Sequence, residues 1–261
     1  MSRHFLVIGG QRCGTTYLHT LLEAHPDIVM ARPVRPEPKV FLDDDLAGRG
    51  VEWYDETYFP HAAGEARWGE KSTSYIESAE AAGRAADVLG DADALVVMRD
   101  PVARAVSNWR FSSDNGLETR PLPEALEENL DRPLAWDGAG TSVSPFAYLE
   151  RGRYADYLPP WQEAFPDRVH LLFLPDLLTG TGIADLYARL GVDAAFRPAG
   201  AGKPVNESER EAPDLDRSLV TRLRRYFAGS DATLASLVGR TVPWPTDDPG
   251  TGTPHLKEEP R

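Results

Sequence analysis

The sequence has a single cysteine, Cys13, and no long apolar segment. One cysteine excludes an internal disulfide framework and a multi-cysteine zinc site, and it fits a reducing compartment. No apolar run approaches the roughly 20 residues that span a bilayer. The apolar run at residues 5–8 is too short for the core of a signal peptide. We therefore expect a cytoplasmic protein that has no membrane partner.

Positive charge is also scarce, because 28 Lys and Arg stand against 41 Asp and Glu, which gives a formal net charge of −13. A chain this acidic lacks the general basic surface with which proteins bind nucleic acid, so we expect no nucleic-acid partner. Any anionic ligand must then be held by a local cluster of basic side chains. The sequence does not indicate an oligomeric state.

The chain is long enough for one large domain with its own core, since 41% of its 261 residues are hydrophobic. We assign residues 1–244 to this domain. Residues 245–261 contain four prolines and few apolar side chains, so we expect a disordered C-terminal tail.

Strand-like and helix-like segments alternate along the domain. The apolar run at residues 5–8 is typical of a strand buried on both faces, and further strands are expected at residues 94–98 and 169–174. Thr15 or Thr16 is expected to cap a helix that His25-Pro26 ends, and Asp100-Pro101 is expected to start another. Further helices are expected around residues 154–165 and from Asp216 onward. This alternation predicts the α/β class, with a central parallel sheet flanked by helices in three layers.

Three segments are less regular. Residues 31–50 are rich in proline, glycine and charge, and we expect them to form a loop over the sheet edge. Residues 114–146 are expected to form a mobile insertion with one short helix. Residues 197–214 are expected to form another long loop.

A glycine-rich turn follows the first strand. Gly9 and Gly14 have the spacing of a P-loop, and the next helix points its positive end and backbone N–H groups at the turn, as an anion site requires. A kinase or ATPase would need lysine at position 15, where this chain has Thr15. The only cation in the turn is Arg12. The turn is thus suited to a phosphate group but lacks the usual residues for magnesium-bound triphosphate.

Two ordered motifs make the chain resemble the sulfotransferases that use 3′-phosphoadenosine 5′-phosphosulfate (PAPS). GGQRCGTTYL at 9–18 resembles their 5′-phosphosulfate loop, and VVMRDPVARAVSNW at 96–109 resembles their 3′-phosphate motif. Further segments are similar to the heparan-sulfate-type branch of that family: Glu37-Pro38-Lys39-Val40-Phe41, Glu52-Trp53-Tyr54 through Phe59-Pro60, Gly69-Glu70-Lys71-Ser72, Arg151-Gly152-Arg153-Tyr154 and Gly239-Arg240-Thr241. Together these matches cover most of residues 1–244, and they imply a P-loop-like fold.

The resemblance implies a role for each matching residue. Arg12 and Lys71 would stabilise the sulfuryl group and its leaving phosphate, and Glu37 would be the general base that takes the acceptor's proton. PAPS would be the co-substrate, and no metal is expected. The residues implied in donor binding are Gln11, Arg12, Cys13, Gly14, Thr15, Thr16, Arg99, Ser107, Lys203 and Arg210. In the family an aromatic side chain stacks on adenine, but this sequence has none between Phe196 and Tyr226.

We therefore interpret the chain as a sulfotransferase acting on a hydroxyl, or an amine, of a carbohydrate or small natural product. One alternative is a P-loop kinase for a small molecule, which Thr15 opposes. Another is a nucleotide-binding module without catalysis. The sequence does not identify the acceptor.

Overall fold

The computed structural model describes residues 2–138, 143–202 and 214–246. In these ranges, five parallel strands form one sheet in the order β2-β3-β1-β4-β5. The strands are β1 (His4–Gly9), β2 (Ile28–Met30), β3 (Arg67–Lys71), β4 (Asp93–Met98) and β5 (Val169–Phe173). The α/β class and the parallel sheet that the sequence predicts are therefore confirmed.

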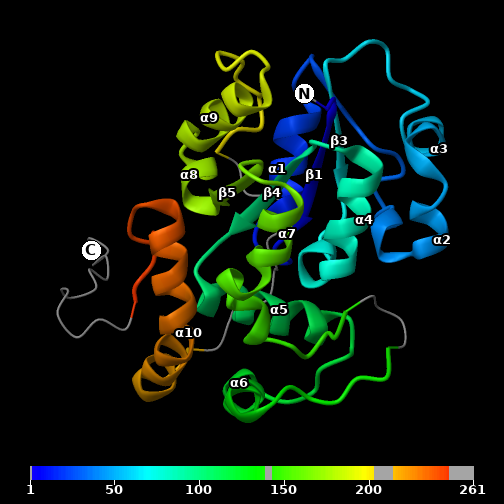
Figure 1. Cartoon of the computed structure of the whole chain (residues 1–261). Coiled ribbons are helices and arrows are strands. Elements are labelled where there is room, and N and C mark those ends of the chain that lie inside the picture. Colours follow the sequence, from blue (N-terminus) through cyan, green and yellow to red (C-terminus); the bar gives the residue numbers. More distant parts are fainter. Residues whose placement is uncertain (1, 139–142, 203–213, 247–261) are drawn as a thin grey trace.

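Helices connect the strands and cover both faces of the sheet (Figure 1). They are α1 (Thr15–Glu23), α2 (Asp44–Ala47), α3 (Gly50–Tyr58), α4 (Ala79–Leu89), α5 (Pro101–Asp114), α6 (Leu122–Asp131), α7 (Leu158–Ala164), α8 (Leu174–Leu178), α9 (Thr181–Leu190) and α10 (Arg217–Val238). Short 3₁₀ turns are η1 (Val40–Leu42), η2 (Tyr75–Glu77), η3 (Glu150–Gly152) and η4 (Tyr154–Tyr157).

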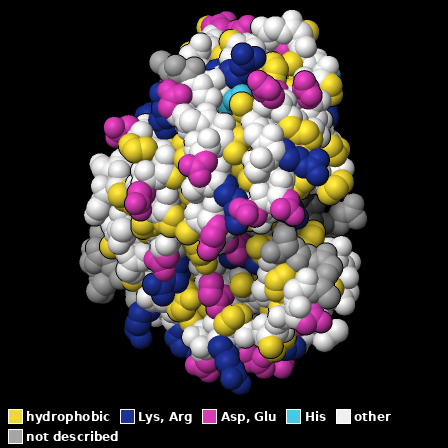
Figure 2. Space-filling model, turned by 45° about the vertical axis from the view of Figure 1, so that its right-hand side comes forward, with side chains coloured by type: hydrophobic (Ala, Val, Ile, Leu, Met, Phe, Trp, Pro, Cys, Tyr) yellow, Lys and Arg dark blue, Asp and Glu magenta, His cyan; other side chains and the backbone are white. Residues whose placement is uncertain are grey.

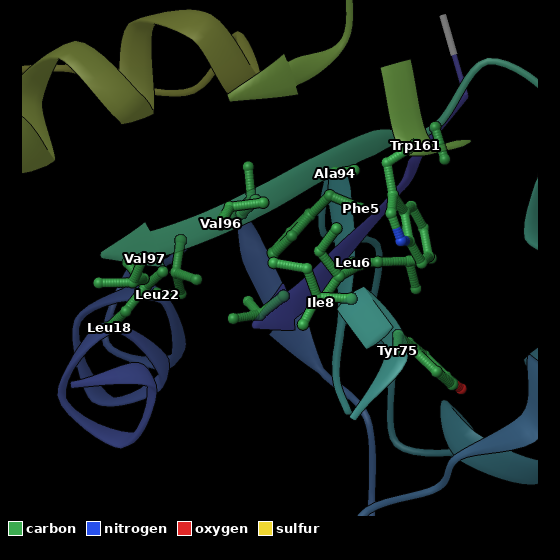
Figure 3. Close-up of a cluster of buried hydrophobic side chains, with 14 of the residues drawn as sticks. Phe5, Leu6, Ile8, Leu18, Leu22, Tyr75, Ala94, Val96, Val97 and Trp161 are labelled. Carbon is green, nitrogen blue, oxygen red and sulfur yellow. The ribbon is translucent and has the colours of Figure 1, made fainter. Parts of the chain in front are cut away.

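The core lies on both sides of β1 and β4, whose residues are buried along their whole length. In the close-up, Val97 lies beside Leu18 and Leu22 of α1 (Figure 3). Leu6 and Ile8 lie on the side of Tyr75 and Trp161, which come from η2 and α7. Side chains of β1 and β4 thus pack against two helical layers, and both strands are buried along their whole length, which explains why they are apolar without alternation.

Local sequence signals explain several helix ends. Asp100 caps α5, because its Oδ1 accepts hydrogen bonds from the N–H groups of Val102 at 2.8 Å and Ala103 at 3.4 Å, and Pro101 is the first helical residue. Asp216 caps α10 in the same way. The short helix that the sequence predicts between residues 114 and 146 is α6.

Three expectations need correction or lie beyond the structure. Neither Thr15 nor Thr16 caps α1, because the cap position is Gly14, and the helix begins at Thr15 without a side-chain cap. Residues 31–50 are not all loop, since they contain η1 and α2. The proposed tail lies almost entirely outside the described residues. No helix in the described ranges is long and apolar enough to cross a bilayer.

Candidate functional site

The glycine turn between β1 and α1 is fixed against the neighbouring strand. The N–H of Gly10 donates to the carbonyl oxygen of Val97 in β4 at 2.9 Å. Gly14 has a φ of +90°, and a Cβ there would lie 2.6 Å from a methyl group of Leu174. Only glycine fits this position without strain. The turn is thereby held at the carboxyl edge of the sheet, where open α/β sheets bind ligands.

Arg12 extends from this turn to α5. Its Nε donates to Oγ of Ser107 at 3.2 Å, and its guanidinium carbon lies 5.0 Å from the ring centre of the half-exposed Phe111. Arg99 follows β4 directly, and its Nη1 donates to the carbonyl oxygen of Arg12 at 3.4 Å. The tertiary structure therefore brings together Arg12, Arg99 and Ser107, which belong to two motifs that are far apart in the sequence.

A third arginine, Arg104, lies behind this pair and was missed by the sequence reasoning. It is fully buried in α5, where its Nη1 donates to Oδ1 of Asn108 at 3.4 Å and its Nη2 to the carbonyl oxygen of Tyr148. Burial lowers the pKa of Arg12, and the cations Arg99 and Arg104 lower that pKa further. Arg104, Asn108 and Ser112 recur every four residues beside the apolar stripe of α5, and this row of polar residues is the signal that could have revealed Arg104.

These three arginines make no ion pair with any carboxylate in the described part of the chain. Asp114 and Glu77 act on Arg12 and Arg104 without forming an ion pair with them, so the cluster keeps a positive charge that an anion bound beside it would compensate. The residues present therefore fit a ligand that carries phosphate groups.

The other predicted loop residues line or support the turn. Thr15 is buried and Thr16 is partly exposed, and within the described ranges neither side-chain hydroxyl makes a hydrogen bond to protein. Gln11 is partly exposed. Cys13 is fully buried, and its Sγ lies 3.3 Å from the hydroxyl oxygen of Tyr154. Burial raises the pKa of the Cys13 thiol, so Cys13 packs beneath the turn as a neutral group.

Glu37 and Lys71, the other two predicted catalytic residues, form an ion pair with each other. Glu37 also accepts hydrogen bonds from the N–H of Thr73 at 3.0 Å and from its Oγ1 at 3.2 Å. The exposed fraction is 17% for the Glu37 side chain and 9% for that of Lys71. Thr73 is a further residue that sequence reasoning did not identify, since a backbone donor leaves no signal in a sequence.

Beneath this pair is a buried carboxylate, Glu70. Tyr54 donates to its Oε2 at 2.7 Å, Ser72 donates to its Oε1, and burial raises the pKa of Glu70. Ser72 Oγ also accepts from the N–H of Lys39 at 2.9 Å. Glu70 and Ser72 thus link the end of β3 to the loop that carries Glu37.

The sheet register brings this pair to the glycine turn. Lys71 pairs with Val7 of β1, only two residues before the turn begins, and the N–H of Ser72 donates to the carbonyl oxygen of Val7 at 3.2 Å. On the other side of β1, Gly9 pairs with Val96 of β4. The Glu37–Lys71 pair and the arginine cluster therefore flank one turn at one edge of the sheet.

Two predicted residues, Lys203 and Arg210, lie outside the described residues. The described chain reaches Gly202, whose N–H donates to the hydroxyl of Tyr17 in α1 at 2.7 Å. Across the described ranges, no group of three or more His, Cys, Asp or Glu side chains is arranged to hold a metal ion. One face of the molecule shows acidic and basic side chains interspersed rather than gathered by sign (Figure 2).

The family model and the similar proteins of known function all name sulfotransferases. The family model of the sulfotransferase domain matches residues 2–177. Heparan sulfate glucosamine 3-O-sulfotransferase 3B1 of Mus musculus is 26% identical over 92% of this chain, which spans 64% of that protein's length. Heparan sulfate glucosamine 3-O-sulfotransferase 6 of Mus musculus is 31% identical over 92% of this chain and 72% of its own length.

The fold also has a counterpart among solved structures. The sulfotransferase from Alicyclobacillus acidocaldarius superposes with a TM-score of 0.69 and 24% sequence identity. The match covers 91% of this chain and 96% of that one. This likeness supports the three-layer architecture, independently of the motifs.

Proposed function

The chain belongs to the sulfotransferase domain family, and from this membership we propose that it transfers a sulfuryl group from PAPS to an acceptor hydroxyl. The observation that carries the proposal is the arginine cluster beside the glycine turn. Three cations without carboxylate partners among the described residues suit a donor that carries a 5′-phosphosulfate and a 3′-phosphate.

In the proposed reaction, the acceptor oxygen attacks the sulfur of PAPS. The new oxygen–sulfur bond forms as the bond between sulfur and the 5′-phosphate oxygen breaks, and the hydroxyl proton passes to Glu37. The products are a sulfated acceptor and 3′-phosphoadenosine 5′-phosphate (PAP). Arg12, Lys71 and the N–H groups of the turn would stabilise the charge that develops on the leaving phosphate and the sulfuryl oxygens.

For the acceptor, we propose a carbohydrate or a small natural product. The support is the similarity of the chain to 3-O-sulfotransferases of heparan sulfate glucosamine and the ion pair of Glu37 with Lys71 beside the turn. An amine acceptor is a second possibility of the same chemistry. A cytoplasmic location stays a prediction from the single cysteine.

Thermal unfolding with ligands tests the proposal. PAP should raise the melting temperature in the presence of a chelator that removes magnesium. Stabilisation by ATP that requires magnesium, without an effect of PAP, would instead indicate a kinase. A panel of carbohydrates and hydroxylated natural products with sulfur-labelled PAPS then identifies the acceptor. Binding of PAP without transfer to water or to any acceptor would indicate a non-catalytic nucleotide-binding module.

A further inference from the structure

We propose that Tyr154 is a positioning residue that couples the two phosphate-binding halves of the donor site. This inference rests on the proposed function, because it concerns the same PAPS site. Tyr154 is 1% exposed, and its hydroxyl donates to the carbonyl oxygen of Arg99 at 2.9 Å while lying 3.3 Å from Sγ of Cys13. The hydroxyl therefore contacts the glycine turn and the end of β4 at the same time.

Contacts of the chain before and after Tyr154 fix the position of this residue. Gly152, in the turn η3 just before it, would bring a Cβ to 2.7 Å from the ring of Phe227 and 2.9 Å from Pro101. Only glycine lets this turn pack so closely against α5 and α10. Directly after Tyr154, the N–H of Ala155 donates to Oγ of Ser230 in α10 at 3.2 Å. The chain is thus held against α5 and α10 two residues before Tyr154 and against α10 directly after it.

The donor and the acceptor of each hydrogen bond around Tyr154 can be assigned. A phenol has one proton, and Tyr154 gives it to the carbonyl oxygen of Arg99. The phenolic oxygen is then an acceptor for the thiol of Cys13, which burial keeps protonated by raising its pKa. The other acceptor near this thiol, the carbonyl oxygen of Gln11, is farther away at 3.6 Å.

These contacts close a ring. From Tyr154 the ring passes to the backbone of Arg99, from the Arg99 side chain to the carbonyl oxygen of Arg12, and through the next peptide to Cys13. We call these four residues the tyrosine ring. It joins Arg12 of the 5′-phosphosulfate turn to Arg99 of the 3′-phosphate motif, although β1 and β4 carry them separately.

The consequence is preorganisation of both arginines. Without the hydroxyl, the strand end that carries Arg99 and the turn that carries Arg12 keep the Gly10–Val97 and Arg99–Arg12 hydrogen bonds but are held less rigidly, and donor binding must then order them further. A ligand with both phosphates needs the turn with Arg12 and the strand end with Arg99 in the correct relative position. A ligand with only the 5′-phosphate needs the turn alone, so it should be affected less.

The test is Tyr154→Phe, which keeps the aromatic side chain and removes only its hydroxyl. We expect the affinity for PAP, measured by calorimetry, to fall about three- to tenfold, the range that one lost hydrogen bond accounts for. The affinity for AMP, which lacks the 3′-phosphate, should fall by less than about twofold. The ratio of the two affinities is the decisive quantity, since a loss of stability alone would not change it.

Tyr187→Phe is the matched control. The Tyr187 side chain is also buried, and its hydroxyl donates to a backbone carbonyl oxygen, that of Leu21, at 2.7 Å, away from the turn. This variant should lose stability and keep the ratio of PAP to AMP affinity. An unchanged ratio in Tyr154→Phe, with PAP still bound by the native protein, would overturn the proposal. Failure of the native protein to bind PAP would instead refute the proposed function.

Cys13→Ala removes the thiol that contacts the Tyr154 hydroxyl, and it tests the proposal if Tyr154→Phe does not fold. It should also lower the affinity for PAP more than that for AMP, and Cys13→Ser, which restores a donor, should recover part of the loss. Equal losses for the two ligands in Cys13→Ala would show that the contact supports the 5′ turn alone. That result would contradict the coupling.

Discussion

Individual residues of the proposed donor site concentrate positive charge in a protein that is acidic as a whole. Arg12, Arg99 and Arg104 have no carboxylate partner among the described residues, whereas other buried arginines are neutralised, Arg67 by Asp93 and Arg151 by Glu77. For Arg12 and Arg99 the difference indicates function, because an anion-binding arginine must keep donors for the ligand. Arg104 is fully buried and donates from both Nη atoms to protein acceptors, so it adds positive charge behind the other two.

Arg99→Ala should weaken PAP binding by one to two decades while leaving the weak binding of AMP almost unchanged. The physical reason is the loss of charge-assisted hydrogen bonds to the 3′-phosphate, which contribute about 1.5–3 kcal/mol. Calorimetry with both ligands measures the effect. Arg84→Ala, which removes an arginine that pairs with the exposed Asp44 away from the turn, is the control. Equal losses for PAP and AMP would assign Arg99 to the fold or to the 5′ side.

Glu37→Gln should lower the turnover number about 10²- to 10⁴-fold, the range that general base catalysis supplies, with PAP affinity within about twofold of native. The amide retains an oxygen that can accept from Thr73 but cannot take the acceptor's proton. Steady-state kinetics with the identified acceptor, together with PAP calorimetry, separate the two effects. Glu65→Gln changes a partly exposed carboxylate that precedes β3, remote from this pair, and should leave both unchanged. Native turnover in Glu37→Gln would remove Glu37 from the mechanism.

At the scale of elements, α5 and α10 hold the donor site together. α5 carries Arg104 and Ser107, and its cap Asp100 accepts two hydrogen bonds from Arg224 of α10, at 2.7 and 2.6 Å. α10 also carries Asp231, which is 2% exposed and forms no ion pair within the described ranges, although the Trp244 side chain offsets part of the cost of its burial. Burial raises the pKa of Asp231 to about 6.

Asp231→Asn should stabilise the protein near neutral pH. The folded-state pKa is above that of an unfolded aspartate, about 4, so the folded state resists ionisation. Native stability therefore falls as pH rises from about 4 to about 6 and then levels off. We expect the variant to exceed the native free energy of unfolding by about 1–3 kcal/mol at pH 7.5. The gap should shrink as pH falls toward 4.5.

Urea denaturation at several pH values measures this gap. Asp87→Asn, at an exposed position of α4, is the control and should show no such pH dependence. A gap of constant size across the pH range would mean that the Asp231 carboxyl group does not ionise in this window.

At the scale of the whole molecule, net charge sets which partners the protein excludes. With a net charge of −13, and with charges of both signs interspersed on the face in Figure 2, long-range attraction does not favour polyanions. The proposed binding of PAP therefore depends on the placed arginines rather than on the overall charge.

We therefore expect no saturable binding of labelled duplex DNA at about 0.15 M salt, up to a protein concentration of about 10 µM. Fluorescence polarisation measures this, with a basic DNA-binding protein as the positive control. Saturable binding in that range would show that a basic surface exists which neither the composition nor the described face reveals.

The amino-acid sequence by itself predicted, from its apolar runs, three of the five strands in the described ranges, together with the P-loop-like turn, but these runs did not predict β2 or β3. The apolar runs of β1, β4 and β5, the Asp100-Pro101 start of α5 and the P-loop spacing are local features, and each depends on residues within a few positions of one another. The same is true of the family match for Glu37 and Lys71. The cap of α1 was the local prediction that failed, because the turn required Gly14 in a left-handed conformation at the position where a threonine cap would stand.

Only the tertiary structure decided which of these groups meet. Arg104 is buried behind the turn, Thr73 donates to Glu37 through its backbone, and Tyr154 joins Cys13 to Arg99 across 141 and 55 residues of sequence. Such contacts follow from the strand order β2-β3-β1-β4-β5 and from close packing at Gly152. They depend on the summed packing of distant elements, so no local pattern in the sequence specifies them.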